Sequence, residues 1–437
     1  MEMHLINENI WFDSNKLFIV KGEKNKNVYE EWYDSFPEIK ANSALSKEFF
    51  PQLIFISSQS CNLRCRYCYA DAGTYGINKF DKSFFQVEDY ISSYLFMLEK
   101  YGKISGINFF GGEPLLNYKE IKKFVEWLFS NYEQESIPPL SISTNGTIMT
   151  EEIKAFLTQY KIPIGTSLDG NRELNDEIRI NKNGSGTFDI INKNMYSLTN
   201  DIKKGIQMTI SRIHLENYTK GGIIPHLKAI ENTGISNYEF VPVVSDDLKL
   251  KIDISNLEIK ESFEQLCRDF LEYSLERLID EEDKPLPNMI VSYMARIMKR
   301  EYQTDCAAGH SFSISPDKKV YPCHAFAHMK DAGIEMDDNF KLNLDENHFF
   351  KQNRMLSRED ISKCRSCIAK KICFYWCRGL VCSYKKTFLD TLEERCILVK
   401  IVVEGIVDFL ANDYEPKKEI VDSKIRKHHG IGSGIHI

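Results

Sequence analysis

Closely spaced cysteines are the residues of this 437-residue chain with the clearest chemical meaning. Eleven of the twelve cysteines lie in two groups, and short fixed offsets are typical of thiolates that hold iron or zinc. The candidate metal ligands are Cys61, Cys65 and Cys68 in the first group and Cys306, Cys323, Cys364, Cys367, Cys373, Cys377 and Cys396 in the second. The run from Cys364 to Cys377 should arise by chance about once in several thousand such chains.

The first group has the spacing Cys-x3-Cys-x2-Cys and only three thiols. Three thiolates leave one iron of a four-iron cluster without a protein ligand, so that iron is available to an exchangeable molecule. A zinc knuckle would need a fourth Cys or His nearby, and between Met1 and Ile104 only the distant His4 is present. The spacing therefore favours an iron-sulfur cluster with catalytic work to do.

An alternation of short β-rich runs and amphipathic stretches surrounds these cysteines between Pro51 and Val244. Repeated βα units imply a parallel sheet with helices outside it, and six units predict an α/β fold with a partial (β/α)6 TIM-like barrel. The predicted strands are Leu53 to Ser57, Ile104 to Phe110, Leu140 to Thr144, Ile162 to Leu168, Gly205 to Ser211 and Tyr238 to Val244.

Four polar or cysteine-bearing motifs follow the first four predicted strands. The three cysteines follow the first, Gly111 to Pro114 the second, Asn145-Gly146 the third and Asp169-Gly170 the fourth. Because chemistry in such barrels sits at the carboxyl ends of the strands, we expect all four motifs on one face.

The remaining segments divide the chain into five regions. The second cysteine group lies where apolar periodicity weakens, which is typical of a small domain held by metal. Cys267 belongs to an apolar helical stripe and is interpreted as a core residue. The predicted regions are 1–50 with a hairpin at 10–20 and a helical piece at 27–36, a barrel at 51–250, a helical linker at 251–304, an iron-sulfur domain at 305–400, and a C-terminal helix end with a flexible tail at 401–437.

Composition excludes several classes of partner. A net charge of −7 argues against nucleic acid, since phosphate binding needs concentrated Lys and Arg. The N-terminus lacks the pattern of a signal peptide, and no stretch approaches 18 uncharged apolar residues. We therefore expect a cytoplasmic protein without a membrane partner, whose thiols serve metal or catalysis rather than disulfides.

The three-cysteine motif, with Tyr67 before its last cysteine, and the Gly-Gly-Glu-Pro turn after the second strand resemble the radical S-adenosylmethionine superfamily. The resemblance implies that the open iron binds S-adenosylmethionine, which one electron cleaves to a 5'-deoxyadenosyl radical. It implies that Glu113 holds the methionyl amine, with Ser167 and Arg179 as candidates for the methionyl carboxylate. Arg179 could equally be a surface arginine, and Asn145 could bind the ligand or only turn the chain. The cofactor-binding residues so implied are Tyr67, Gly111, Gly112, Glu113, Pro114, Asn145, Ser167 and Arg179.

The second cysteine group resembles the SPASM extension of peptide-modifying radical enzymes, apart from Lys318, where the family usually has glycine. The resemblance implies two auxiliary four-iron clusters and thus three 4Fe-4S clusters in all. The outer one would use Cys364, Cys367, Cys373 and Cys396, and the inner one Cys306, Cys323 and Cys377. The inner cluster then lacks a fourth ligand, which Cys382, His310, His324 or a substrate thiolate could supply.

These resemblances together imply a maturase of ribosomally made peptides that forms thioethers, of the ranthipeptide or sactipeptide type. Its partners would be a precursor peptide with a leader and an external electron donor, flavodoxin or ferredoxin. The segment before the barrel is shorter than a full leader-binding domain, so the leader would pair with the hairpin edge or need a separate protein. The alternatives are a formylglycine-forming anaerobic sulfatase-maturating enzyme, a maturase that links carbon to carbon, and a plain electron carrier.

Overall fold

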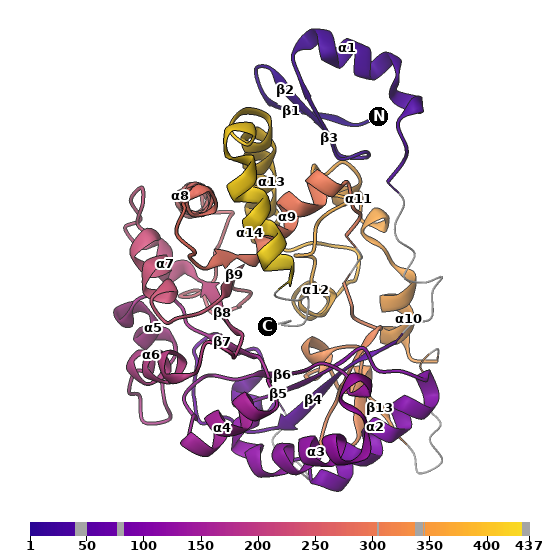
Figure 1. Ribbon diagram of the computed structural model, residues 1–437, viewed down its shortest axis with the longest axis vertical. Coiled ribbons are helices and arrows are strands. Elements are labelled where there is room, and N and C mark those ends of the chain that lie inside the picture. The colour runs from indigo at the N-terminus through magenta and orange to yellow at the C-terminus, as the bar shows by residue number, and fades with distance from the viewer. Residues whose placement is uncertain (40–49, 77–82, 304–305, 337–343, 345, 431–437) are drawn as a thin grey trace.

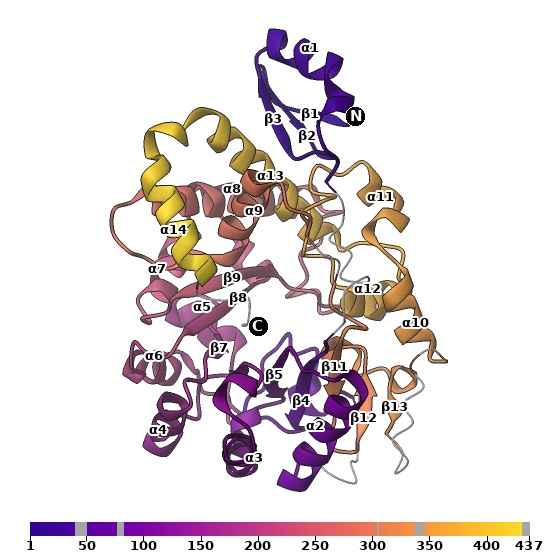
Figure 2. The same ribbon diagram turned by 45° about the vertical axis from the view of Figure 1, so that its right-hand side comes forward.

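A strongly curved, mostly parallel sheet forms the centre of the molecule (Figures 1 and 2). The computed structural model describes all residues except 40–49, 77–82, 304–305, 337–343, 345 and 431–437. Within the described residues the strand order is β10-β9-β8-β7-β6-β5-β4-β11-β12-β13. The stretch from β4 to β9 runs in chain order with parallel pairing throughout, which is the predicted partial barrel.

The six predicted barrel strands are confirmed, with ends that shift by at most a few residues. Their apolar residues are buried because the sheet carries helices on one side and faces the C-terminal region on the other. The strands are β4 (Gln52–Ser58), β5 (Gly106–Gly111), β6 (Leu140–Ser143), β7 (Ile164–Ser167), β8 (Lys204–Ile210) and β9 (Asn237–Pro242).

Helices connect these strands and cover the outer face of the sheet. Several begin at side-chain caps that the sequence supplies; Thr150 accepts a hydrogen bond from Ile153 N, and Asn171 accepts one from Leu174 N. The helices are α2 (Val87–Tyr101), α3 (Tyr118–Asn131), α4 (Glu151–Gln159), α5 (Arg172–Ile178), α6 (Phe188–Ser197) and α7 (Ile224–Glu231).

Segments from the C-terminal half extend the sheet at both edges. The strand β10 (Leu286–Pro287) pairs with β9, and β11 (Ser311–Ile314) pairs with β4. The sheet then continues through β12 (Lys319–Tyr321) and β13 (Ile334–Glu335), which are antiparallel. The cysteine-rich region is therefore continuous with the barrel sheet.

Lys318 takes the left-handed conformation in the turn between β11 and β12, with φ +60°. This is a conformation that glycine adopts at lower cost than lysine. The turn is closed by a hydrogen bond from Lys318 N to Ser315 O at 2.9 Å. Lys318 thus has the backbone conformation that favours glycine at this position.

The N-terminal unit is a small sheet with a helix against it, at one end of the molecule (Figure 1). The predicted hairpin is confirmed as β2 (Ile10–Asp13) and β3 (Phe18–Lys21), and the structure adds β1 (Met3–Asn7), which sequence reasoning missed. The helix α1 (Glu23–Glu31) begins earlier than predicted. Tyr29 on this helix stacks on Phe18 and donates a hydrogen bond to Asp13 at 2.7 Å.

The rest of the C-terminal half is mainly helical. Cys267 is fully buried in α8, so its interpretation as a core residue is confirmed. None of the helices in the described part of the chain combines the length and apolar composition that crossing a bilayer needs. The helices are α8 (Leu257–Ile279), α9 (Asn288–Lys299), α10 (His348–Met355), α11 (Ser362–Arg365), α12 (Arg378–Lys385), α13 (Glu393–Asn412) and α14 (Lys418–Gly430).

The prediction of a flexible C-terminal tail is wrong as far as Gly430, where α14 ends. Val421 and Ile425 of this helix are buried in the main core, and Lys424 Nζ donates to Arg277 O at 2.7 Å. Val421 and Ile425, four positions apart, thus form the apolar face of a helix within a charged segment, which is the sequence pattern that predicts such a helix. The last part of the predicted tail, 431–437, lies outside the described residues, as do 304–305 at the predicted domain boundary.

Two glycines join the ends of β4 and β5 by close backbone contact. A Cβ atom on Gly111 would lie 2.4 Å from Ser58 O, and one on Gly112 would lie 2.3 Å from Ser60 O. Gly112 N donates to Ser58 O at 2.7 Å, and Glu113 N donates to Ser60 O at 2.9 Å. This contact fixes the chain just before Cys61.

We expect Gly112→Ala to lower the free energy of unfolding by about 1–3 kcal/mol, because the methyl group must push backbone atoms apart. Gly106→Ala at the start of β5, the strand that ends just before Gly112, is the matched control, since its Cβ would make only ordinary contacts of 3.6 Å or more. Denaturant unfolding of both variants measures the difference. Equal stability of the two variants would show that the turn tolerates a side chain.

Candidate active site

A cavity of about 450 Å³ opens inside the curved sheet and collects most of the predicted cofactor residues. Such a volume suits a small organic ligand. The barrel contributes Cys61, Cys65, Cys68, Tyr67, Gly111, Gly112, Asn145, Ser167 and Arg179 to its lining. The cysteine-rich region contributes His324, Tyr375, Cys377 and Arg395 from the facing side.

The three-cysteine segment is held in place by backbone and side-chain hydrogen bonds. Arg64 N and Arg66 N donate to Ile180 O and Ile178 O, which fastens the segment to the end of α5. Asn145 Nδ2 lies 3.6 Å from Cys61 Sγ, and Leu63 N lies 3.4 Å from the same sulfur. Donors that point at a sulfur favour its thiolate form.

Burial raises the pKa of two thiols of the first group, Cys65 and Cys61. The pKa of Cys65 rises to about 11; Arg179 opposes this rise, and the neighbouring thiols Cys68 and Cys61 add to it. The pKa of Cys61 is also raised by burial. At neutral pH these thiols therefore stay protonated until a metal cation displaces the protons and binds the thiolates.

Among the described residues, no three His, Cys, Asp or Glu side chains close around a single ion position. Zinc holds its thiolates at about 2.3 Å, so it would draw the sulfurs together. The three thiols instead lie along the wall of a cavity. This donor set fits a group larger than one ion.

Glu113 is fully buried, and it is absent from the lining of the cavity in the described chain. Its carboxylate accepts hydrogen bonds from Leu115 N at 3.0 Å, Thr144 Oγ1 at 2.7 Å and Asn145 N at 2.7 Å. A carboxylate offers about four acceptor positions, so three are already used. Glu113 thus ties β5 to β6, and Pro114 begins the short turn that follows it.

Arg179 belongs to a buried chain of hydrogen bonds, so the alternative that it is a plain surface arginine is wrong. Only 5% of its surface is exposed. Its Nη1 donates to Tyr67 Oη at 2.6 Å, and that hydroxyl donates to Asp169 Oδ2 at 2.6 Å. Thr209 N donates to the other oxygen of Asp169 at 3.0 Å.

The guanidinium of Arg179 also has an N–H donor that is available to a ligand. Arg179 Nε is buried without a hydrogen-bond partner, and the residue lines the cavity beside Cys65 and Ser167. A fork of N–H donors next to a hydroxyl is a suitable site for a carboxylate. Asn145 meanwhile accepts from Thr147 N at 2.9 Å, so it also turns the chain.

The second cysteine group surrounds a narrower cavity. Cys364, Cys367, Cys373 and Cys396, the predicted outer ligands, line it together with Cys377. Burial raises the pKa of both Cys364 and Cys396 to about 12, and the nearby Cys373 thiol adds to each rise. Four thiols around one space form a donor set that fits a four-iron cluster.

The predicted inner ligands also lie close together. Burial raises the pKa of Cys323 and Cys377, and Cys306 raises both further. Cys382 differs, because burial raises its pKa and only Lys386 opposes, with no contribution from another thiol. It packs in an apolar cluster with Phe326 and Phe388. His324 borders the main cavity and shares a hydrogen bond of 2.7 Å with Tyr69.

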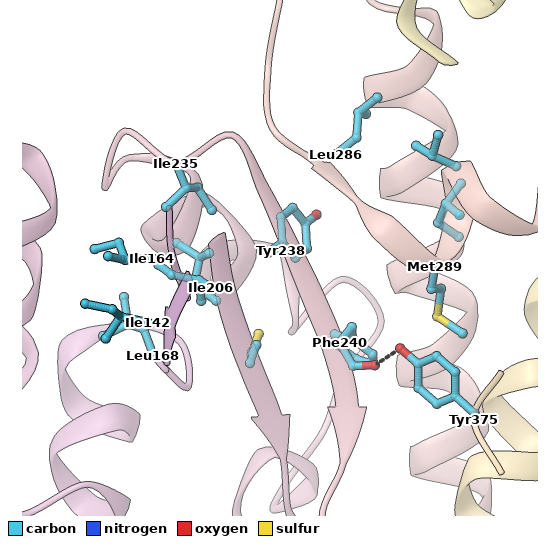
Figure 3. Packing of buried hydrophobic residues seen from close by; sticks show 14 of the residues in the cluster. Ile142, Ile164, Leu168, Ile206, Ile235, Tyr238, Phe240, Leu286, Met289 and Tyr375 are labelled. Carbon is cyan, nitrogen blue, oxygen red and sulfur yellow. Dashed lines mark hydrogen bonds between the residues drawn. The ribbon is translucent and has the colours of Figure 1, made fainter. Parts of the chain in front are cut away.

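Three residues of the cavity region escaped sequence reasoning. Asp169 was noted only as part of a turn, Glu239 lies within a strand, and Tyr375 lies between two cysteines. Tyr375 donates to Phe240 O at 2.9 Å, which ties the cysteine-rich region to β9 (Figure 3). A polar residue in an otherwise apolar strand was the one signal available for Glu239.

Comparison with known proteins gives a consistent family assignment. The sequence model of the Radical SAM superfamily matches residues 55–210. An uncharacterized protein of Methanocaldococcus jannaschii is 36% identical over 41% of this chain, which covers 60% of that relative. The radical SAM cyclopropyl synthase TigE of Paramaledivibacter caminithermalis is 25% identical over 90% of this chain and 81% of its own length. A cysteine-type anaerobic sulfatase-maturating enzyme of Clostridium novyi is 31% identical over 37% of this chain and 46% of its own.

Solved structures share the fold. The protein anSMEcpe with bound AdoMet superposes with a TM-score of 0.67 at 18% identity, covering 85% of this chain and 98% of its own. SuiB of Streptococcus suis bound to S-adenosylmethionine gives a TM-score of 0.56 at 17% identity, covering 86% and 84%. Residues 55–210 thus match the sequence model of the Radical SAM superfamily, and the chain is similar in sequence to the cyclopropyl synthase TigE and to a sulfatase-maturating enzyme.

Proposed function

We propose that the protein modifies a ribosomally made peptide by joining a cysteine sulfur to a carbon atom. The observation that carries this proposal is the position of Cys377, which borders both the main cavity and the cavity of the outer thiols. A substrate in the main cavity would thus lie between the three-cysteine site and the inner thiols.

The residues of the main cavity would have distinct roles in binding the cluster and S-adenosylmethionine. Cys61, Cys65 and Cys68 would hold a four-iron cluster, with Arg179 and Ser167 holding the carboxylate of S-adenosylmethionine. With S-adenosylmethionine bound, this cluster would supply the electron that gives a 5'-deoxyadenosyl radical, which removes hydrogen from the acceptor residue.

The inner thiols support a site that is open to substrate. Cys306, Cys323 and Cys377 are electrostatic neighbours, whereas Cys382 is not among them. A fourth position for the inner cluster is then left for a substrate thiolate or His324. A SPASM-type domain with two auxiliary clusters follows from this assignment.

A second candidate is ring closure between carbon atoms. It is favoured by the match to the cyclopropyl synthase TigE, which extends over 90% of this chain. A peptide substrate suits both candidates, and SuiB has been solved bound to the precursor peptide SuiA.

The N-terminal unit offers a place for the leader. A groove of about 450 Å³ runs between β3 and α1, and in the described residues β3 pairs only with β2. The unpaired edge can receive an extended peptide as an added strand. The half-exposed Val28 and the 59% exposed Trp32 give the groove an apolar wall. An external electron donor, flavodoxin or ferredoxin, completes the proposed partners.

The cluster assignment predicts the iron content of two variants. Cys61→Ala should abolish cleavage of S-adenosylmethionine and keep about two thirds of the iron, because the other two clusters remain. Cys382→Ala, the control, should keep all of it. Iron and sulfide analysis of anaerobically reconstituted protein measures both. Retention of only one cluster in Cys61→Ala would contradict two auxiliary clusters.

Mass spectrometry of the peptide tests the reaction. With a short cysteine-rich precursor peptide as substrate, we expect the loss of two hydrogens and of one thiol that iodoacetamide can label. Loss of two hydrogens with every thiol still reactive would support ring closure between carbons instead. A shift that matches formylglycine would reject both.

The leader groove predicts a difference between two exposed apolar residues. Trp32→Ala should weaken binding of the same peptide about tenfold, since it removes apolar surface beside the β3 edge. Leu5→Ala on β1 is equally exposed and lies at the opposite edge of the small sheet, so it should not change affinity. Fluorescence anisotropy of labelled peptide measures both, and equal affinities would exclude this groove.

A further inference from the structure

Glu239 faces the main cavity from β9, in a row of polar residues. Ser167 of β7 is paired with Gln207 of β8, and Gln207 is paired with Glu239. All three residues line the cavity. Neighbouring strands lie about 4.8 Å apart, so the Glu239 backbone is about 10 Å from that of Ser167 in the same row.

Glu239 is the one carboxylate in the lining of this cavity, as far as the chain is described. Tyr375 Oη lies 3.4 Å from Oε2, which is long for a hydrogen bond between oxygens, and the same hydroxyl donates to Phe240 O at 2.9 Å. Figure 3 shows Tyr375 directed at the Phe240 carbonyl. The carboxylate therefore has acceptor capacity to spare.

The charges around the carboxylate suit an anion held nearby. Arg395 from α13 lines the same cavity, and its buried Nε has no hydrogen-bond partner. Arg179 stands on the far wall beside the three-cysteine site. A thiolate formed in this cavity would gain an attractive partner in these guanidinium groups.

We propose that Glu239 accepts the proton of the substrate cysteine as its thiol enters the cavity. The S–H bond breaks, the O–H bond of the Glu239 carboxylic acid forms, and the electron pair stays on sulfur, so no oxidant is needed. This step rests on the proposed function, because it prepares the thiolate that a thioether requires.

The ionisation of Glu239 is matched to this task. Burial raises its pKa to about 7, while Asn288 and Tyr375 lower it. A free thiol has a pKa of about 8.5, so the proton passes between groups of similar affinity. Since the acceptor is the ionised carboxylate, its fraction rises as the pH rises through 7.

In the described part of the chain, Tyr375 and Asn288 interact with Glu239 from other elements, and Arg395 lines the same cavity. Tyr375 comes from the loop before α12 and Arg395 from α13. Asn288 begins α9, and behind it His428 of α14 shares a hydrogen bond with Asn288 Oδ1 at 2.5 Å. A purely structural role would make Glu239 a link between β9, Asn288 and Tyr375, and that role needs no proton transfer.

Infrared difference spectroscopy separates the two roles without turnover. The reconstituted holoenzyme with S-adenosylmethionine would be mixed with N-acetylcysteine methylamide at pH 7.5. In the wild type we expect the bound probe to lose its S–H stretching band while a protonated carboxyl band appears. Glu239→Gln should retain the S–H band and lack the new carboxyl band, and Glu126→Gln on the exposed face of α3 should behave as the wild type.

Three results would overturn the proposal. They are a probe that does not bind the wild type, an S–H band that persists in the wild type, and a new carboxyl band that also appears in Glu239→Gln. The wild-type spectrum alone decides the question if the variant fails to fold.

Turnover distinguishes this proposal from the function on which it rests. Glu239→Gln should lower the rate of peptide modification by about 100-fold or more and remove its rise between pH 6 and 7.5. An unchanged rate and pH profile with a thioether product would contradict Glu239 alone. A wild-type product without a thioether would contradict the proposed function, while the spectra would still decide the role of Glu239.

Discussion

The structure depends above all on the protonation state of its buried cysteine thiols. Burial and neighbouring thiols together raise the pKa of thiols such as Cys65, Cys364 and Cys396 to about 11 or 12. Such groups ionise only when a strongly bound cation compensates them. Each cavity wall must then hold several sulfurs at a fixed separation in the absence of direct bonds between them. The strand ends of the sheet do this for the first group, whereas Cys364 lies in α11 and Cys396 in α13.

The sheet fixes the position of the first cysteine group through backbone contacts more than through side chains. Gly111 and Gly112 let the end of β5 press against residues just before Cys61. Glu113 then fastens the end of β6 through Thr144 and Asn145. Gly111 and Gly112 also line the main cavity, so the same close contact places their backbone at the cavity wall.

The barrel and the grouping of cysteines could be predicted because their signals are local. Short β-rich runs located all six strands, and fixed offsets located the thiols. The hydrogen-bond chain from Arg179 through Tyr67 to Asp169 could not be predicted, because Tyr67 is more than 100 residues from each of the other two and meets them only in the folded barrel. Glu239 and α14 were missed for related reasons: the first depends on strand register, and the second on two apolar residues in a charged segment.

The residues Tyr375, Cys377 and Arg395 form a partition that both cavities share. A larger or smaller side chain at any of these positions would reshape the substrate space and the surroundings of the outer thiols at once. If the outer thiols hold the cluster proposed for them, a substitution in this partition that suits a new peptide would therefore also change the surroundings of that cluster. Divergence of substrate preference should be found on the barrel side of the cavity, at positions such as Val241 and Val243, where a change in shape leaves the thiols untouched.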